Sequence, residues 1–381
     1  MALHETDIWN RIRDPEAPAF IVAEIGKNQL QTADERLVDE YLENAKALVH
    51  AARDAGADAV KFQTHILEDE QHPEHAVKGP HFDMDRRAWV ERNERATPLN
   101  RFWIPIKDLC DALGLVFFST PMSRKAAELL REKVGVPLWK IASSDILDFV
   151  MLDYIRATGL PVIISSGMST IGEVERALNF LHARNERVAL LHCVSKYPCP
   201  PEELRLGTMR FLREHLPSTP VGFSDHSTDI DPPVVAVAFR ARIIEKHFSL
   251  SRHFAGSDHK VSLEPAEFAE MVRKIRRVEN DRGFRALVRR SDFAVRSLAQ
   301  SDKVVQDSEV RFRPVFRKGL VAARDIATEE TLSPEMIFSI RPFGQLPIDT
   351  LPSDRYEKLL GRTMRRPLKK YESFIDADLV S

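Results

Sequence analysis

The chain has 381 residues, enough for an α/β barrel of ordinary size and a second small domain. Its formal net charge of -2 and pI of about 6.7 exclude a broad basic surface, so no nucleic-acid partner is expected. No apolar run approaches the roughly 18 residues of a membrane span, the first residues are polar, and three cysteines are too few for a disulfide framework. We expect a cytoplasmic protein with no membrane partner.

Short apolar runs, many of which end in a polar residue able to do chemistry, set the predicted architecture. Eight such runs begin at Phe20, Ala59, Val116, Leu138, Val162, Val188, Val221 and Ile243. Helical patterns separate the runs. Eight strand–helix units of this kind close a parallel barrel whose strand ends form one active site. The predicted fold class is therefore α/β, a (β/α)8 TIM barrel.

The helices between the runs are recognisable by periodicity and by their caps. They are expected over residues 36–55, 124–133, 170–183 and 265–278. Ser123 and Ser169 are the expected N-caps of the second and third. The longest connection, residues 63–116, would form a lid or wall on the substrate side, or a plain surface excursion.

Composition divides the chain into four parts. Residues 1–18 form an N-terminal extension, and residues 19–282 carry the barrel pattern. Residues 283–314 are charged, with short helical pieces, which is typical of a linker. Residues 315–381 contain short apolar runs between turn residues and predict a compact β-rich domain that is too small to be very stable alone.

Two histidines stand at the ends of neighbouring predicted strands. His226 follows the seventh apolar run and His247 ends the eighth. Two imidazoles so placed can share one divalent ion and leave positions for water and substrate, although each alone also suits a structural role. Glu24 ends the first strand beside them, where a carboxylate suits a metal ligand, an acid/base group or a structural ion pair.

Lysines and hydroxyl groups follow the other predicted strands. Lys61 and Lys140 lie on the second and fourth strands, and Gly167 would let backbone amides approach a ligand closely. The hydroxyls are those of Ser119, Thr120, Ser143, Ser165, Ser166 and Ser224. This set suits a phosphate or a carboxylate, although any single serine can equally serve as a helix cap. No glycine-rich nucleotide motif follows a strand.

Segments throughout the chain resemble the sialic acid synthase family, which includes N-acetylneuraminate, legionaminate and pseudaminate synthases. The matching segments are IVAEIGKN, GADAVKFQTH, FFSTPMSRKAAELL, LWKIASSDILD, VIISSGMST, LLHCVSKYP, VGFSDHS, IIEKHF and GSDHKVSLEP. The tail LVAARDIATEETLSPEMIFSIRPFG is similar to that family's C-terminal antifreeze-like (SAF) domain, a small β-clip fold. The resemblance covers roughly residues 20–381 in the family's order.

The resemblance implies a transferase that condenses phosphoenolpyruvate with an N-acylated hexose, giving a nonulosonic acid and phosphate. It implies a divalent metal, Mn²⁺ with Mg²⁺ or Co²⁺ as alternatives, on His226 and His247. The catalytic residues implied are Glu24, Asp145 and Arg341. The implied phosphoenolpyruvate site comprises Lys61, Gln63, Thr120, Lys140, Ser143, Ser165 and Ser224, and the sugar site comprises Asn28, Tyr197, Asp258 and Arg341. It also implies a homodimer, in which Arg341 reaches over the partner's active site.

Four departures from the family's pattern lie where the sugar or the edge of the cleft would be. Gln29 stands where the family has His, Asp145 replaces Glu, Ser195 replaces Asn, and the loop segment KGPHFD lacks an expected Asn. The metal and phosphate positions match. The acceptor is therefore expected to be a modified or phosphorylated relative of N-acetylmannosamine.

Two other functions remain compatible with the sequence. One is a related aldolase or 3-deoxy-sugar synthase, which would join phosphoenolpyruvate or pyruvate to a different aldehyde; an aldolase would use Lys140 as its Schiff-base lysine. The other is a sugar-binding protein without catalysis, against which the intact His226 and His247 argue.

Overall fold

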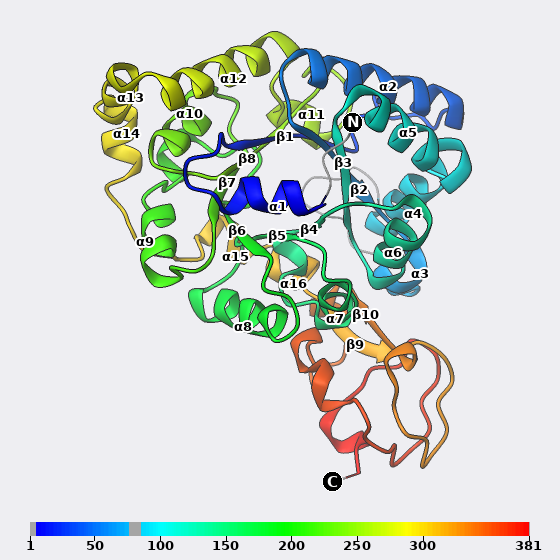
Figure 1. Ribbon diagram of the computed structural model, residues 1–381. Helices are drawn as coiled ribbons and strands as arrows, with labels where there is room; N and C mark the ends of the chain where they lie inside the picture. Colours follow the sequence, from blue (N-terminus) through cyan, green and yellow to red (C-terminus); the bar gives the residue numbers. More distant parts are fainter. Residues whose placement is uncertain (1–4, 76–84, 381) are drawn as a thin grey trace.

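The computed structural model describes residues 5–75 and 85–380 of the chain. Eight parallel strands follow the order β3-β2-β1-β8-β7-β6-β5-β4, and β3 also contacts β4, so the sheet curves into a barrel (Figure 1). The strands are β1 (Phe20–Gly26), β2 (Ala59–Thr64), β3 (Val116–Pro121), β4 (Trp139–Ile141), β5 (Val162–Ser165), β6 (Val188–Cys193), β7 (Val221–Asp225) and β8 (Ile243–His247). The predicted TIM-like fold is confirmed.

A helix follows each strand and packs outside the barrel. These helices are α2 (Val38–Asp54), α5 (Ile104–Leu113), α6 (Arg124–Leu129), α7 (Phe149–Ala157), α8 (Ile171–His182), α9 (Thr208–His215), α10 (Asp231–Ala238) and α12 (Pro265–Asn280). Ser123 caps α6 as expected, since its hydroxyl accepts the Ala126 amide at 3.3 Å. The prediction of Ser169 as the cap of α8 is wrong by one residue, because the Thr170 hydroxyl accepts the amide of Glu173.

The connection after β2 is built mostly of helix rather than loop. It contains α3 (Leu67–Glu70), α4 (Arg86–Ala96) and a π-helical turn over Leu99–Trp103 before α5. The segment KGPHFD, residues 78–83, lies outside the described residues. After β8 the short helix α11 (Ser257–Val261) plays a similar part, so both connections form walls above the strand ends.

The interior of the barrel is apolar at the end where the strands begin. Its buried layer comprises Phe20, Val22, Ala59, Val116, Phe118, Leu138, Ile163, Ala189, Leu191 and Ile243. Helix α1 (Glu5–Arg13) lies across this end and buries Ile8 and Ile12 against the layer (Figure 1). Because side chains alternate along a strand, residues two positions further on face the same interior at the other end.

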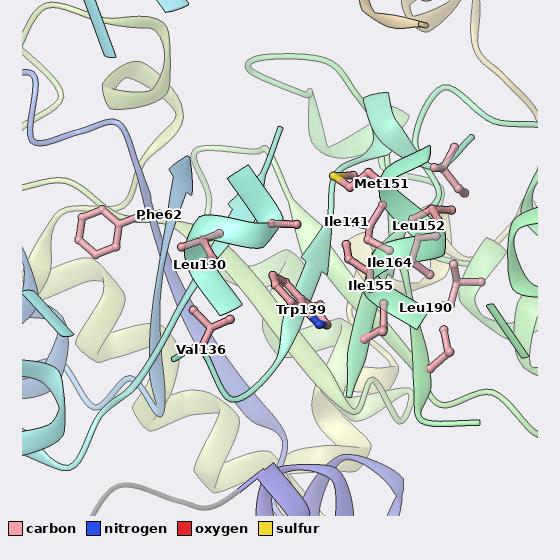
Figure 2. Close-up of a cluster of buried hydrophobic side chains, with 14 of the residues drawn as sticks. Phe62, Leu130, Val136, Trp139, Ile141, Met151, Leu152, Ile155, Ile164 and Leu190 are labelled. Atoms are coloured by element: carbon pink, nitrogen blue, oxygen red, sulfur yellow. The ribbon is translucent and has the colours of Figure 1, made fainter. Parts of the chain in front are cut away.

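The opposite faces of the strands pack against the surrounding helices. Figure 2 shows this outer core around β4, where the apolar side chains are Trp139, Ile141, Met151, Leu152, Ile155, Ile164 and Leu190. Lys140 lies between Trp139 and Ile141 in sequence, so the same alternation points it into the barrel. Burial of the apolar neighbours therefore fixes the direction of a charged side chain.

The C-terminal part follows the barrel through short helices. These are α13 (Arg282–Arg289), α14 (Asp292–Ser297), α15 (Asp307–Val310) and α16 (Arg313–Phe316). The antiparallel pair β9 (Gly319–Ala322) and β10 (Ile337–Ile340) then opens a small domain of turns and isolated bridges, which lies beside α7 (Figure 1). None of the helices over residues 5–75 and 85–380 is long and apolar enough to cross a membrane.

Candidate active site

A cavity of about 160 Å³ opens at the ends of the barrel strands. Thirteen of the fifteen residues predicted for the site line it, namely Glu24, Lys61, Gln63, Thr120, Lys140, Ser143, Ser165, Tyr197, Ser224, His226, His247, Asp258 and Arg341. Most stand two or four positions after a member of the apolar interior layer. Strand alternation thus places a polar ring directly above the apolar one.

Glu24 and Lys61 form a buried ion pair between adjacent strands. The Lys61 ammonium lies 2.6 Å from the Glu24 carboxylate and donates to the Thr120 hydroxyl at 3.0 Å. The Gln63 amide donates to the other Glu24 oxygen at 2.9 Å. Burial raises the pKa of Glu24 while Lys61 opposes the rise. This carboxyl group is consequently poised to hold or release a proton inside the cavity.

Glu245 is a site residue that the sequence analysis missed. It lines the cavity from β8, accepts the Ser224 hydroxyl at 3.0 Å, and lies 3.6 Å from Lys140 and 3.8 Å from Lys61. Burial alone would raise its pKa, but the two lysines lower the pKa of Glu245 to about 2. The spacing Ile243–Glu245–His247 was the available signal, since all three face the interior.

Hydroxyl groups surround the second lysine. Lys140 donates to the Ser165 hydroxyl at 2.8 Å, and the Gly167 amide donates to the Ser143 hydroxyl at 3.0 Å. A Cβ at Gly167 would lie 2.3 Å from the Ser195 hydroxyl, so the close approach of these loops requires glycine. Two ammonium groups and several hydroxyls therefore converge where an anionic substrate can bind.

His226 and His247 lie side by side with their ring centroids 5.4 Å apart. His226 Nδ1 lies 2.7 Å from the Val194 carbonyl oxygen, an arrangement that leaves Nε2 with a free lone pair when Nδ1 carries the proton. His247 Nδ1 is buried without a hydrogen-bond partner among the described residues. The pair therefore fits a shared divalent ion. No group of three or more potential ligand side chains occurs over residues 5–75 and 85–380, so water or substrate would supply the other ligands.

Charged and aromatic side chains line the cavity or pack against the residues that line it. Tyr197 stacks on His226 with centroids 4.0 Å apart, and Lys27 lies 4.0 Å from the Trp89 ring centroid. Lys27 also donates to Gln63 at 2.8 Å and lies 3.9 Å from Asp258. Together, these side chains provide hydrogen-bonding and stacking surfaces for a polar substrate such as a sugar.

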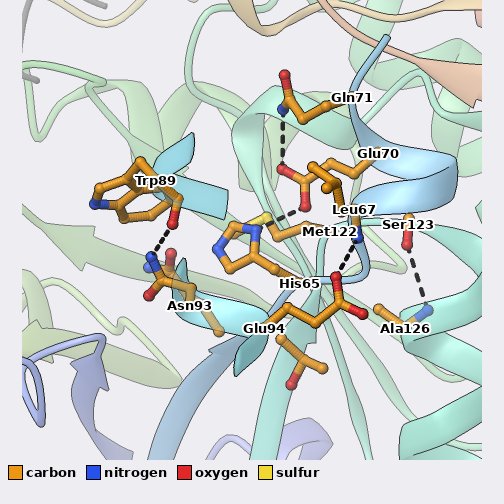
Figure 3. Close-up of polar contacts among 12 residues, drawn as sticks. His65, Leu67, Glu70, Gln71, Trp89, Asn93, Glu94, Met122, Ser123 and Ala126 are labelled. Atoms are coloured by element: carbon orange, nitrogen blue, oxygen red, sulfur yellow. Dashed lines mark hydrogen bonds and ion pairs between the residues drawn. The ribbon is translucent and has the colours of Figure 1, made fainter. Parts of the chain in front are cut away.

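Helix α3 holds further charged groups against the cavity wall. Figure 3 shows Glu70 between His65 and Gln71, with His65 Nδ1 2.6 Å from a Glu70 oxygen. Arg86 donates to the other Glu70 oxygen at 3.2 Å. His65 and Arg86 both line the cavity, and the sequence analysis selected neither. A lone histidine after β2 and an arginine on a distant helix carry no local pattern that marks them.

Two predicted site residues do not reach the cavity. Asn28 is buried and donates to the Phe248 carbonyl at 2.9 Å and the Ser262 hydroxyl at 3.0 Å, so it supports the walls. Asp145 is also fully buried, and its Oδ1 pairs with Arg341 and lies 2.9 Å from Lys318. The 3-10 turn after β4 directs Asp145 toward these two cations and away from the cavity.

Arg341 lines the cavity of its own barrel in this single chain. Its backbone pairs with α3, through Arg341 N to the Glu70 carbonyl and His72 N to the Arg341 carbonyl, both at 3.0 Å. Its side chain, 1 % exposed, contacts Asp145. The small C-terminal domain can thus complete a site without a second subunit, while the expected homodimer stays a prediction.

The segment before that domain also closes the cavity. Glu309 of α15 is buried, and its Oε1 accepts the backbone amides of Met168 and Ser195, each at 2.8 Å. Phe312 and Phe316, a few residues further on, line the cavity. The linker expected from composition is therefore part of the site. Cys193, at the end of β6, also lines the cavity.

Known proteins are similar to this chain over most of its length. Residues 48–286 match the NeuB family and residues 317–380 match the SAF domain. The chain is 31% identical to an N,N'-diacetyllegionaminic acid synthase of Campylobacter jejuni, over 93% of this chain and 98% of that protein. It is 30% identical to an N-acetylneuraminate-9-phosphate synthase of Mus musculus, over 84% of this chain and 82% of that protein.

A solved structure agrees with these matches. The spore coat polysaccharide biosynthesis protein SpsE of Bacillus subtilis superposes with a TM-score of 0.76, at 31% identity and 96% coverage of both chains. The barrel, the SAF domain and the relatives that match most of the chain all lead to the same assignment. This chain belongs to the NeuB family and is an enzyme of the sialic acid synthase type.

Proposed function

We propose that the protein condenses phosphoenolpyruvate with an N-acylated amino sugar to give a nonulosonic acid and phosphate. The polar ring supports this proposal: Lys61 and Lys140 donate to hydroxyl groups, and the His226/His247 pair lines the same cavity. The lysines and hydroxyls suit a small phosphorylated acid, and the histidine pair suits a metal-assisted carbonyl. Synthases of legionaminic and pseudaminic acids among the relatives support the same reaction class.

The reaction forms one carbon–carbon bond between the two substrates, adds one water and releases phosphate. The C3 carbon of phosphoenolpyruvate attacks the aldehyde carbon of the open sugar, water adds at C2, and the resulting intermediate expels phosphate. A divalent ion held by His226 and His247 supplies Lewis-acid polarisation of the aldehyde when bound. Lys61, Lys140 and the surrounding hydroxyls hold the phosphate and carboxylate, so that binding energy is used for positioning.

Glu24 is the proposed acid/base group for the added water. Its carboxylate stands at the end of β1 in register with His247, and its pKa is raised by burial. Phe312 and Phe316 line the cavity and would reduce the access of bulk water to the reacting atoms. Lys61 would exchange part of its pairing with Glu24 for the substrate anion, which frees the carboxylate to take a proton.

The acceptor is proposed to be a modified or phosphorylated relative of N-acetylmannosamine. Of the three named departures from the family's pattern, only Ser195 lines the cavity, whereas Gln29 and Asp145 are buried and do not line it. Lys27, Arg86 and Arg341 add three cations at the outer part. A steady-state screen of N-acylated hexoses would test this, and highest efficiency on N-acetylmannosamine itself would refute it.

Phosphate release measured with phosphoenolpyruvate, candidate sugars and Mn²⁺, Mg²⁺ or Co²⁺ tests the reaction. Lys61→Met should raise the KM for phosphoenolpyruvate or abolish turnover, since a charge-assisted contact is lost. His226→Ala or His247→Ala should reduce turnover by about a hundredfold or more. Absence of phosphate release and of thermal protection by phosphoenolpyruvate would reject the proposal, and borohydride trapping of pyruvate on Lys140 would establish the aldolase alternative.

A further inference from the structure

A second large depression lies at the opposite end of the barrel, where the strands begin. This basic groove has a volume of about 1010 Å³ and is bounded by α1 and by the loops that precede β6, β7 and β8. Figure 1 shows α1 across the end of the barrel, with α8 and α9, whose following loops border the groove, to one side of it. The groove lies beyond the apolar interior layer from the catalytic cavity, so the two sites do not share a lining residue.

Six arginines line the basic groove, against one acidic residue, Glu186. They are Arg13, Arg184, Arg187, Arg213, Arg240 and Arg242. Arg242 is satisfied, since it donates to the carbonyls of Ile12, Pro15 and Arg11 and so fastens α1 to the barrel. Within residues 5–75 and 85–380, the other five guanidinium groups have no hydrogen bond or ion pair, so strong donors remain available in one depression.

Arg213 shows that the groove is more than a solvated surface. Its Nη1 is buried and has no hydrogen-bond partner in the part of the chain that the structure describes. Burial and the nearby Arg240 lower the pKa of Arg213, although Glu214 opposes this. A buried guanidinium nitrogen without an acceptor costs free energy, and an anion supplied from outside would remove that cost.

Helix dipoles explain only part of this charge. Helices α8, α9 and α10 end on this face, and Arg184, Arg213 and Arg240 lie at or near their C-terminal ends, where cations are favourable. Arg13 lies at the end of α1 in the same way. However, a cation that points into water already interacts favourably with a helix dipole. The dipoles therefore do not explain why Nη1 of Arg213 is buried or why the arginines surround one groove.

We propose that the basic groove binds an oligophosphate anion, such as inorganic triphosphate or the phosphate chain of a nucleotide. Planar guanidinium groups recognise phosphate oxygens in pairs, and five free arginines match an anion of several charges better than a single carboxylate. Trp9, the aromatic ring of the groove, offers a surface for a base or sugar attached to the chain. This site is separate from the proposed phosphoenolpyruvate chemistry.

Calorimetric titration of the full-length protein with inorganic triphosphate and with ATP, at fixed ionic strength and without divalent metal, tests the proposal. Both should bind at one site per chain, and Arg213→Gln/Arg240→Gln should weaken binding by about tenfold or more, since hydrogen bonds from two charged donors are lost. Arg131→Gln/Arg290→Gln removes the same charge from exposed arginines outside the groove and should leave binding unchanged.

Further variants locate the binding and separate its possible origins. Lys61→Met, which disables the catalytic anion site, should retain triphosphate binding, and loss of binding in this variant would overturn the proposal. If the first double variant does not fold, Arg184→Gln/Arg187→Gln removes two donors nearer the surface. Binding of inorganic sulfate as tightly as triphosphate, binding of ATP without triphosphate, or no binding by the wild-type chain would each reject an oligophosphate site.

Discussion

Asp145 is the acidic partner of two cations that the C-terminal part contributes. It pairs with Arg341 and with Lys318, which is 1 % exposed at its side chain and also reaches Asp148 at 2.7 Å. A buried carboxylate in this position acts on the substrate only through Arg341. We therefore interpret Asp145 as a positioning residue, in place of the catalytic role that the family resemblance implied.

Asp145→Asn should destabilise the protein and raise the KM for the sugar more than that for phosphoenolpyruvate. Removing one partner of a buried ion pair costs about 3–5 kcal/mol, and Arg341 would lose its fixed orientation. Urea unfolding and kinetics with each substrate varied measure the two effects. Asp148→Asn removes the other partner of Lys318 without touching Arg341, so it should lower stability alone. An unchanged sugar KM in Asp145→Asn would contradict the positioning role.

Asp69 of α3 makes stability depend on pH. Burial raises its pKa from 3.8 to about 7, although the Lys125 amide donates to Oδ2 at 2.8 Å. Between these values the folded chain keeps a proton that the unfolded chain has lost. Stability therefore falls as pH rises through this window, and the penalty is complete above about pH 7.

Asp69→Asn should remove that penalty, because its amide oxygen can still accept the Lys125 amide. The variant should be more stable than the wild type by about 2–4 kcal/mol at pH 8 and nearly equal to it at pH 3. Urea unfolding at both pH values measures this. The exposed Asp34→Asn serves as the control and should shift neither curve. If the difference in stability between Asp69→Asn and the wild type does not change with pH, the pKa of Asp69 is not raised in the folded state.

Helix α15 connects the loop after β5 to the loop after β6. Glu309 joins the loop after β5, through Met168, to the loop after β6, through Ser195. Those loops carry Gly167 and Tyr197. Composition predicted only a charged linker here, because a carboxylate among polar residues gives no local sign of the backbone amides that it meets across the barrel.

Glu309→Ala should lower both stability and turnover. Two buried amides would lose their acceptor, which costs about 1–3 kcal/mol of stability for each amide. The two loops would also lose their fixed position relative to each other. Glu309→Gln keeps a carbonyl oxygen and should retain most activity, while Asp307→Ala changes the exposed side of the same helix. Thermal unfolding and kcat for the three variants measure the contribution. Equal losses in Glu309→Ala and Asp307→Ala would indicate a general effect on α15.

In the whole molecule, two arrangements of Arg341 are distinguishable by experiment. In the single chain it completes the cavity of its own barrel. In the homodimer that the resemblance implies, it would reach the partner. The contacts with Asp145 and α3 could form across a dimer only if the preceding segment, which Glu309 joins to the barrel loops, crossed to the partner together with the domain.

Mixing Arg341→Ala chains with His226→Ala chains distinguishes the two arrangements. If Arg341 acts across a dimer, each mixed dimer has one site with an intact barrel and an intact arginine, and activity returns. If it acts within its own chain, the mixture stays as inactive as the two parent variants. Exchange of differently tagged subunits must be demonstrated in the same samples, and sedimentation gives the oligomeric state.

Local sequence patterns were enough to predict the barrel and most of the polar ring around its cavity. Eight apolar runs predicted eight strands, and the polar residue near the end of a run marked groups such as Glu24, Lys140 and His247. This worked because strand alternation is local: an apolar layer in the interior fixes which residues follow it on the same face. The same alternation also directs Glu245 into the interior. It was missed because it stands between two isoleucines and a lysine and not at the end of the run.

Which residues meet from distant parts of the chain depends on how whole elements pack. That packing leaves Asp145 and Asn28 outside the cavity lining and brings Arg86, Phe312 and Phe316 to it. It also gathered arginines from four separate loops and helices into the basic groove. Local periodicity fixes the face of an element that is buried, but the packing of one element on another sets the partner of each charged group.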